Sequence, residues 1–168
     1  MRAHELMEGP QSLKLYCDMD GVLVDFHLGV ERTYFDQTGK RVSFQELSKG
    51  EMWKTIIQAG DGWWLNLPWR PGGKQLWNFI KRYRPIILSA PSRQEICVPE
   101  KEEWVAKNMS PDLKVICDAK KWKYATQYGV LIDDMPKNTI PWEEHGGKAI
   151  QHTNTPNTIK QLKKLGFK

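Results

Sequence analysis

The sequence predicts an α/β protein built on a doubly wound parallel sheet. Short runs rich in Ile, Leu and Val alternate along the chain with segments of helical periodicity, and this alternation is typical of such sheets. Polar residues follow each of the first four runs, as expected at the ends of strands that helices cover on both faces. The runs predict strands at Leu13–Cys17, Pro85–Leu88, Leu113–Cys117, Val130–Ile132 and Lys148–Gln151.

Helical patterns, with apolar residues at helical spacing, lie between the later strands. Gly129 and Gly166 follow two of these patterns and are natural helix stops. Thr155 followed by Pro156 is typical of an N-cap and a first helical position. We therefore predict helices over Gly73–Tyr83, Glu100–Asn108, Lys121–Tyr128 and Thr155–Leu165.

The stretch from Phe26 to Trp69 breaks this alternation. It combines helical pieces with a Trp-rich loop, and the chain has 8 Trp in 168 residues. We interpret it as a small helical cap inserted after the first strand. The predicted organisation is a core of residues 1–25 and 70–168 and a cap of residues 26–69.

The bulk composition, 40% hydrophobic and 27% charged, is that of a globular protein able to bury a core. No run of about 18 apolar residues occurs, and Met1–Pro10 lack the apolar segment of a signal peptide. We therefore expect a cytoplasmic protein that binds no membrane. A net charge of +5 suits an anionic substrate but does not by itself indicate nucleic-acid binding. Reduced, buried thiols are expected at Cys17, Cys97 and Cys117.

Two carboxylates, Asp18 and Asp20, directly follow the first predicted strand and precede Gly21. Aspartate is unfavourable in strands, so a pair at this position requires an explanation. One explanation is a surface turn of the Asp-Gly type, which is common. The other is a functional site at the carboxyl end of the sheet, where ligands of such folds bind.

Asp133 and Asp134 end the fourth predicted strand in the same way. Both acidic pairs then fall on one edge of a parallel sheet. Crowded carboxylates resist ionisation unless a cation joins them, and oxygen ligands with open positions suit Mg²⁺ together with a substrate phosphate. The pattern therefore predicts a magnesium site formed by Asp18, Asp20, Asp133 and Asp134.

The remaining two strand ends carry groups suited to an anion. Ser89 and Ala90 end the second strand, where a hydroxyl and free backbone N–H groups can hold phosphate. Lys120 and Lys121 start the predicted helix after the third strand, an unfavourable place for a cation relative to the helix dipole. Either lysine can neutralise an anion, and an exposed surface lysine is the alternative interpretation for each.

The order Asp-x-Asp-Gly, Ser, Lys and Asp-Asp at successive strand ends resembles the haloacid dehalogenase superfamily of phosphohydrolases, over Leu13 to about Leu165. Within it, the chain is most similar to the 5'(3')-deoxyribonucleotidases and their phage and bacterial relatives. The stretches that carry this similarity are 18–26 (DMDGVLVDF), 62–68 (GWWLNLP), 87–91 (ILSAP) and 131–134 (LIDD). Ser89 stands where that family usually has Thr.

This resemblance implies a role for each residue. Asp18 would attack phosphorus and form an aspartyl-phosphate, and Asp20 would act as general acid and then general base. Mg²⁺ would be held by Asp18, by the backbone carbonyl of Asp20 and by an acid of the 133–134 pair. Ser89, Ala90 and a lysine, for which the spacing favours Lys121, would hold the phosphoryl oxygens.

The cap is expected to select the substrate. Trp53, Trp63, Trp64 and Trp69 could stack on a nucleobase, a contact worth about 1–3 kcal/mol per base, or they could form the core of the cap; of these we favour Trp63 and Trp64 as substrate contacts. The favoured function is a 5'-nucleotidase acting on a small phosphomonoester, a (deoxy)nucleoside monophosphate. The alternatives are a 3'-phosphatase acting on nucleic-acid ends and a non-catalytic domain that binds phosphorylated ligands.

Overall fold

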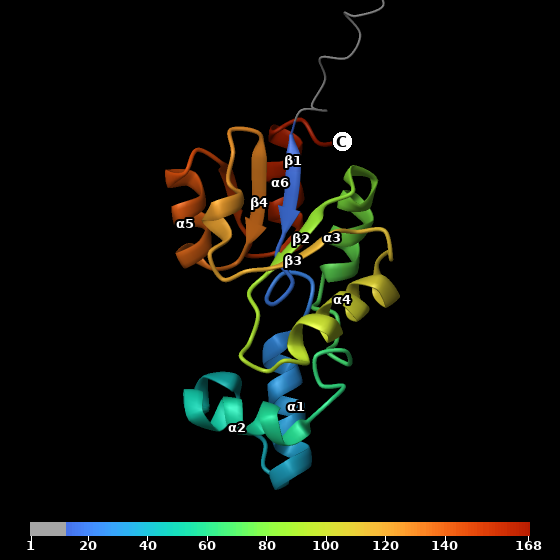
Figure 1. Cartoon of the computed structure of the whole chain (residues 1–168), viewed down its shortest axis with the longest axis vertical. Coiled ribbons are helices and arrows are strands. Elements are labelled where there is room, and N and C mark those ends of the chain that lie inside the picture. The colour runs from blue at the N-terminus through green and yellow to red at the C-terminus, as the bar shows by residue number, and fades with distance from the viewer. Residues whose placement is uncertain (1–12) are drawn as a thin grey trace, which may run out of the picture.

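The computed structural model describes residues 13–168 and contains one five-stranded parallel sheet (Figure 1). Its strands are β1 (Lys14–Cys17), β2 (Ile86–Ser89), β3 (Val115–Cys117), β4 (Gly129–Asp133) and β5 (Lys148–Gln151). The order across the sheet is β3-β2-β1-β4-β5. The chain reverses direction across the sheet between β3 and β4, which places β1 at the topological switch point where α/β folds bind ligands.

Helices cover both faces of the sheet, which confirms the doubly wound class. The larger apolar cluster packs β1, β2, β4 and β5 against α3 (Gly73–Ile80), α4 (Cys97–Asn108) and α6 (Thr155–Lys164). A smaller cluster on the other face packs Leu88 and Leu131 against Trp142 of α5 (Pro136–Glu144). Tyr124 of the 3₁₀ turn η4 (Lys121–Tyr124) packs against this smaller cluster.

The register of the central strands aligns their carboxyl ends. Cys17 of β1 lies beside Ile87 of β2 and Ile132 of β4. The backbone N–H of Asp18 then donates to the carbonyl of Ile132 at 2.9 Å and extends the ladder by one residue. Asp18 and Asp133 therefore leave neighbouring strands at the same level.

Residues 26–69 form α1 (Phe26–Thr38), the 3₁₀ turn η2 (Phe44–Glu46), α2 (Lys49–Ala59) and an irregular Trp loop, residues 60–69. Figure 1 shows α1 and α2 beyond the carboxyl ends of the strands. The chain leaves and re-enters the core side by side, because Val24 bridges Trp69 and the Asp25 N–H donates to the Pro68 carbonyl at 2.9 Å. The Asp25 carboxylate then caps α1 by accepting from Leu28 N–H, which starts the helix at this junction.

Three sequence predictions about helices need correction. The helix predicted over Lys121–Tyr128 is only the turn η4, because Ala125 is extended and the chain turns directly into β4. The N-cap of α6 is Asn154, whose side chain accepts from Asn157 N–H, rather than Thr155. Helix α4 begins at Cys97 rather than Glu100.

Helix α5 was not predicted. Pro136 occupies its first turn and Pro141 lies inside it, so the sequence carries a helix breaker where a helix forms. Met1–Pro10, on which the expectation of a missing signal peptide rests, lie outside the described residues. Within residues 13–168, no helix combines the length and the hydrophobicity needed to cross a bilayer. Cys17 and Cys97 are buried free thiols, and Cys117 is half-buried.

Candidate active site

Asp18 is the first residue beyond β1 and is almost fully buried. Its carboxylate accepts from the backbone N–H of Met19 at 2.8 Å and lies 2.8 Å from the ammonium of Lys121. Burial raises the pKa of Asp18 to about 7; the Lys121 ammonium opposes this rise, and the carboxylates of Asp133 and Asp20 add to it. The site therefore holds a carboxylate that another cation would help to ionise.

Lys121 joins the ends of β1 and β4. Its ammonium lies 2.8 Å from Asp18 and 2.7 Å from Asp133, and its side chain is 1% exposed. Burial disfavours the charged ammonium, but the two carboxylates outweigh it and raise the pKa of Lys121. Lys120 is exposed on the same turn, so the structure brings only the second of the two candidate lysines to the acidic cluster.

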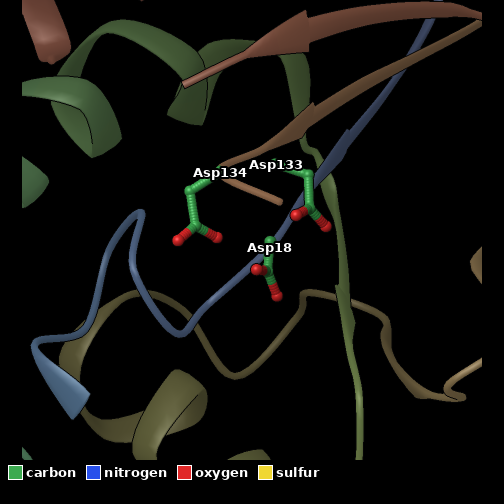
Figure 2. A group of neighbouring side chains, drawn as sticks. All are labelled: Asp18, Asp133 and Asp134. Atoms are coloured by element: carbon green, nitrogen blue, oxygen red, sulfur yellow. The ribbon is translucent and has the colours of Figure 1, made fainter. Parts of the chain in front are cut away.

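Asp133 and Asp134 approach Asp18 from the end of β4, as Figure 2 shows. One carboxylate oxygen from each of the three residues lies within 4.8 Å of the others. Asp133 is fully engaged, because it accepts from Lys121, from the Met135 N–H and from the side chain of Asn138. Burial raises the pKa of Asp134, and the Asp133 carboxylate adds to the rise.

These three carboxylates fit a divalent cation. The Oδ1 atom of Asp134 is buried and has no hydrogen-bond partner within the described part of the chain. A buried carboxylate oxygen without a donor is costly, and a hard cation such as Mg²⁺ would satisfy it. Gly21 has φ +83°, and a Cβ there would overlap the Asp134 carboxylate, so glycine permits this close approach.

A second lysine, Lys101 of α4, completes the other side of the site. Its ammonium lies 2.8 Å from Asp20 Oδ2 and donates to Ser89 Oγ at 2.8 Å and to the Ala90 carbonyl at 2.9 Å. Burial disfavours its charge, but the Asp20 carboxylate outweighs this effect and raises the pKa of Lys101. The general acid and the phosphate-binding residues expected from the sequence are thus held together by one ammonium.

Lys101 was not among the residues predicted from the sequence, although its position in the helix carries a signal. Lys101, Trp104 and Val105 share the buried face of α4, and their i, i+3, i+4 spacing already places Lys101 at a core position of the predicted helix. Lysine is almost never fully buried without a partner. A lysine in the apolar stripe of a helix is therefore a reason to look for a carboxylate facing it.

The two tryptophans favoured for stacking on a base are buried, with 8% of Trp63 and 3% of Trp64 exposed. They pack edge to face, and each indole N–H is bonded, to Thr33 and Gln94 respectively. A hollow of about 520 Å³ lies between α2 and the loop after β2, and Gln94, the partner of Trp64, is part of its lining. Its lining residues are Lys49, Trp53, Ile57, Pro91, Ser92, Arg93 and Gln94.

Comparison with known proteins gives structural rather than sequence matches. No model of a protein family matches the chain, and no curated protein matches it. A hydrolase from Streptococcus pneumoniae TIGR4 superposes with a TM-score of 0.59 at 12% identity, over 89% of this chain and 97% of that one.

Two further solved structures show the same likeness. A HAD-superfamily hydrolase from Ehrlichia chaffeensis gives a TM-score of 0.56 at 16% identity, over 95% of this chain and 98% of that one. A HAD-superfamily hydrolase of subfamily IA from Geobacter sulfurreducens gives 0.55 at 12% identity, over 92% and 99%. The chain therefore has the Rossmann-like α/β fold of the haloacid dehalogenase superfamily hydrolases that it resembles in structure.

Proposed function

We propose that the protein is a Mg²⁺-dependent phosphomonoester hydrolase that works through an aspartyl-phosphate on Asp18. The observation that carries this proposal is the convergence of Asp18, Asp133 and Asp134 beside Lys121, with one buried oxygen of Asp134 left without a donor in the described residues. The fold likeness to hydrolases supports the reaction class.

The proposed reaction has two steps. In the first, an Asp18 carboxylate oxygen attacks phosphorus, the bond from phosphorus to the ester oxygen breaks, and Asp20 gives its proton to the departing alcohol. In the second, Asp20 takes a proton from water, the water oxygen attacks phosphorus, and inorganic phosphate leaves Asp18 as a free carboxylate. A carboxylate nucleophile divides one difficult displacement into two easier ones.

Charge compensation explains the surrounding residues. Asp18, Asp134 and the Asp20 backbone carbonyl would hold Mg²⁺, which when bound reduces the repulsion between the nucleophile and the phosphate dianion. Lys121 would stay beside Asp18 and contact a phosphoryl oxygen. Ser89 Oγ and the backbone around Ala90 would bind the other oxygens, with Lys101 turning from them toward the substrate. Asp133, already engaged by three donors, would orient Lys121 and leave direct metal contact to Asp134.

We further propose a nucleoside monophosphate as substrate. Pro91, which lines the hollow beside α2, directly follows the proposed phosphate-binding residues Ser89 and Ala90 in the chain. Its volume of about 520 Å³ lies within the range of roughly 300–1,000 Å³ typical of small-ligand sites. Trp53 lines this hollow, whereas Trp64 reaches only Gln94 of its wall and Trp63 is not among its lining residues, so Trp53 is the better stacking partner for a base.

The proposal is tested by phosphate release from nucleoside monophosphates, sugar phosphates and end-phosphorylated oligonucleotides, with Mg²⁺ and with EDTA. Mg²⁺-dependent release is expected to be fastest from a nucleoside monophosphate and to fall at least about 10³-fold in Asp18→Asn. Asp112→Asn, which changes an exposed aspartate, is the matched control.

Each other outcome points to a different function. Faster release from oligonucleotide ends would favour a polynucleotide phosphatase. Binding without release from any phosphomonoester would favour a non-catalytic domain. Release that survives Asp18→Asn, in a preparation free of contaminating phosphatase, would mean that Asp18 is not the nucleophile.

A further inference from the structure

Glu100, directly before Lys101 on α4, holds a segment that is distant in sequence. Its carboxylate accepts from the backbone N–H groups of Gly62, of Trp64 at 3.0 Å and of Leu65 at 3.3 Å. The residue is 6% exposed. No lysine or arginine of residues 13–168 forms an ion pair with Glu100. This buried charge is thus stabilised by the N–H groups of the Trp loop.

The segment held by Glu100 also shapes the hollow. The Trp64 indole N–H donates to Gln94 Oε1 at 2.9 Å, and Gln94 lines the hollow below α2. The Lys101 ammonium lies 5.0 Å from the centre of the Trp64 ring, within the range of a cation–π contact. Displacing residues 62–65 would therefore move both the wall of the hollow and the surroundings of Lys101.

Adjacent residues of one helical turn thus fix two different parts. Glu100 fixes the Trp loop, and Lys101 fixes Asp20 and Ser89. We infer that Glu100 is a positioning residue. It holds the Trp loop against α4 and so fixes the position of the substrate hollow relative to the proposed catalytic acid, Asp20. The attachment of the loop follows from the hydrogen bonds of Glu100 alone, whereas its effect on kinetics rests on the proposed function.

The loop requires an acceptor at position 100. Burying a charge costs several kcal/mol before its hydrogen bonds offset the cost, but an apolar side chain would leave the N–H groups of Gly62, Trp64 and Leu65 without their acceptor. The carboxylate is distinguished by its ability to accept from several convergent N–H groups at once. Hydrogen bonds to several N–H groups fix the orientation of the loop backbone, whereas apolar packing is not directional.

The test compares Glu100→Gln with the wild type and with Glu103→Gln, an exposed glutamate on the same helix. The amide keeps the size of the side chain but turns an NH₂ group toward the loop donors. Hydrogen exchange of the amides of residues 62, 64 and 65 is expected to become at least about 10-fold faster, the equivalent of about 1.4 kcal/mol. Glu103→Gln should leave these rates unchanged.

Kinetics then separate positioning from stability. For Glu100→Gln, kcat/KM with a nucleoside monophosphate should fall about 10–100-fold. With p-nitrophenyl phosphate, which has no nucleoside and needs little protonation of its leaving group, it should change less than about threefold. If Glu100→Gln does not fold, Trp64→Phe, which removes the indole bond to Gln94 and part of the ring that faces Lys101 and Trp63, should show the same difference between substrates.

If hydrogen exchange in residues 62–65 is unchanged in Glu100→Gln, Glu100 does not hold the Trp loop and the inference is wrong. Faster exchange with an equal loss of activity on both substrates would overturn the positioning role and leave a structural one. If the wild type releases phosphate from no substrate, the proposed function fails, and the exchange rates still decide whether Glu100 fastens the Trp loop.

Discussion

The two halves of the candidate site handle charge differently. In the strand half, at the ends of β1 and β4, the carboxylates of Asp18, Asp133 and Asp134 face one ammonium, that of Lys121. In the helix half, built by α4, Lys101 pairs with Asp20, and the Glu100 carboxylate accepts hydrogen bonds from backbone N–H groups. Three carboxylates against one ammonium give the strand half the larger excess of negative charge, so it is where a divalent cation is expected.

The largest effect that separates the halves is the loss of a lysine. Lys121→Met would leave three carboxylates without a cation and should lower the free energy of unfolding by about 3–5 kcal/mol in EDTA. Lys101→Met should cost less, because the Asp20 side chain is 28% exposed and can be solvated. Urea denaturation of both variants measures the difference, with Lys107→Met, an exposed lysine of α4, as control. Equal losses would contradict the proposed imbalance of charge.

A medium effect concerns metal binding. Mg²⁺ at about 100 times its dissociation constant should stabilise the wild type by about 2.7 kcal/mol, seen as a higher Tm. Asp134→Asn should abolish most of this shift, because Asp134 belongs to the carboxylate cluster at the strand ends. Asp20 Oδ1 is also buried without a partner among the described residues, but Asp20 lies outside that cluster and is paired with Lys101, so Asp20→Asn should keep most of the shift. If the increase in Tm with Mg²⁺ is lost in Asp20→Asn and kept in Asp134→Asn, the cation binds in the helix half and not in the strand half.

The smallest effect concerns His152, whose pKa is shifted mainly by burial rather than by a neighbouring carboxylate. His152 follows β5, and its Nδ1 lies 2.7 Å from Thr158 Oγ1. Burial, reinforced by the charge of Arg70, lowers the pKa of His152 to about 4. Between about pH 6.5 and 4 the unfolded state binds the proton and the folded state does not, so stability falls as pH falls through this window.

His152→Asn should remove that share of the pH dependence, about 1–2 kcal/mol between the two ends of the window once partial solvation of the ring is allowed for. The measurement is urea denaturation at several pH values, for the variant and the wild type. Parallel curves for the two proteins would show that His152 titrates normally in the folded state.

The sequence predicts the residues of the strand half but not the α4 residues of the helix half. Asp18 and the 133–134 pair stand at the ends of apolar runs, and parallel strands bring such ends to one edge of the sheet, so local pattern was enough to group them. Glu100 and Lys101 act on partners more than ten residues away in the chain. The apolar spacing of α4 marks Lys101 as a core position, but the partners of both residues follow from how α4 packs against the Trp loop and the strand ends, which a local pattern does not specify.

Errors in the secondary structure have similar causes. Residues after Tyr124 have helical composition, but the chain must reach the start of β4, and this tertiary constraint extends Ala125. The prolines of α5 argue against a helix, yet Pro136 in its first turn is tolerated because the early N–H groups have no helical partner. Trp63 and Trp64 were weighed as substrate contacts or cap core, and only the packed structure shows both rings buried.

The central claim, that Asp18 is the nucleophile, is tested most directly by trapping the phosphorylated protein. A nucleoside monophosphate labelled with ³²P is mixed with the wild type and Mg²⁺, quenched in acid within the first turnover, and the protein is digested and mapped. We predict label on the peptide that contains Asp18, removed by a chase of unlabelled substrate and absent from Asp18→Asn. Label on another residue, or rapid phosphate release with no labelled peptide at any quench time, would contradict the account.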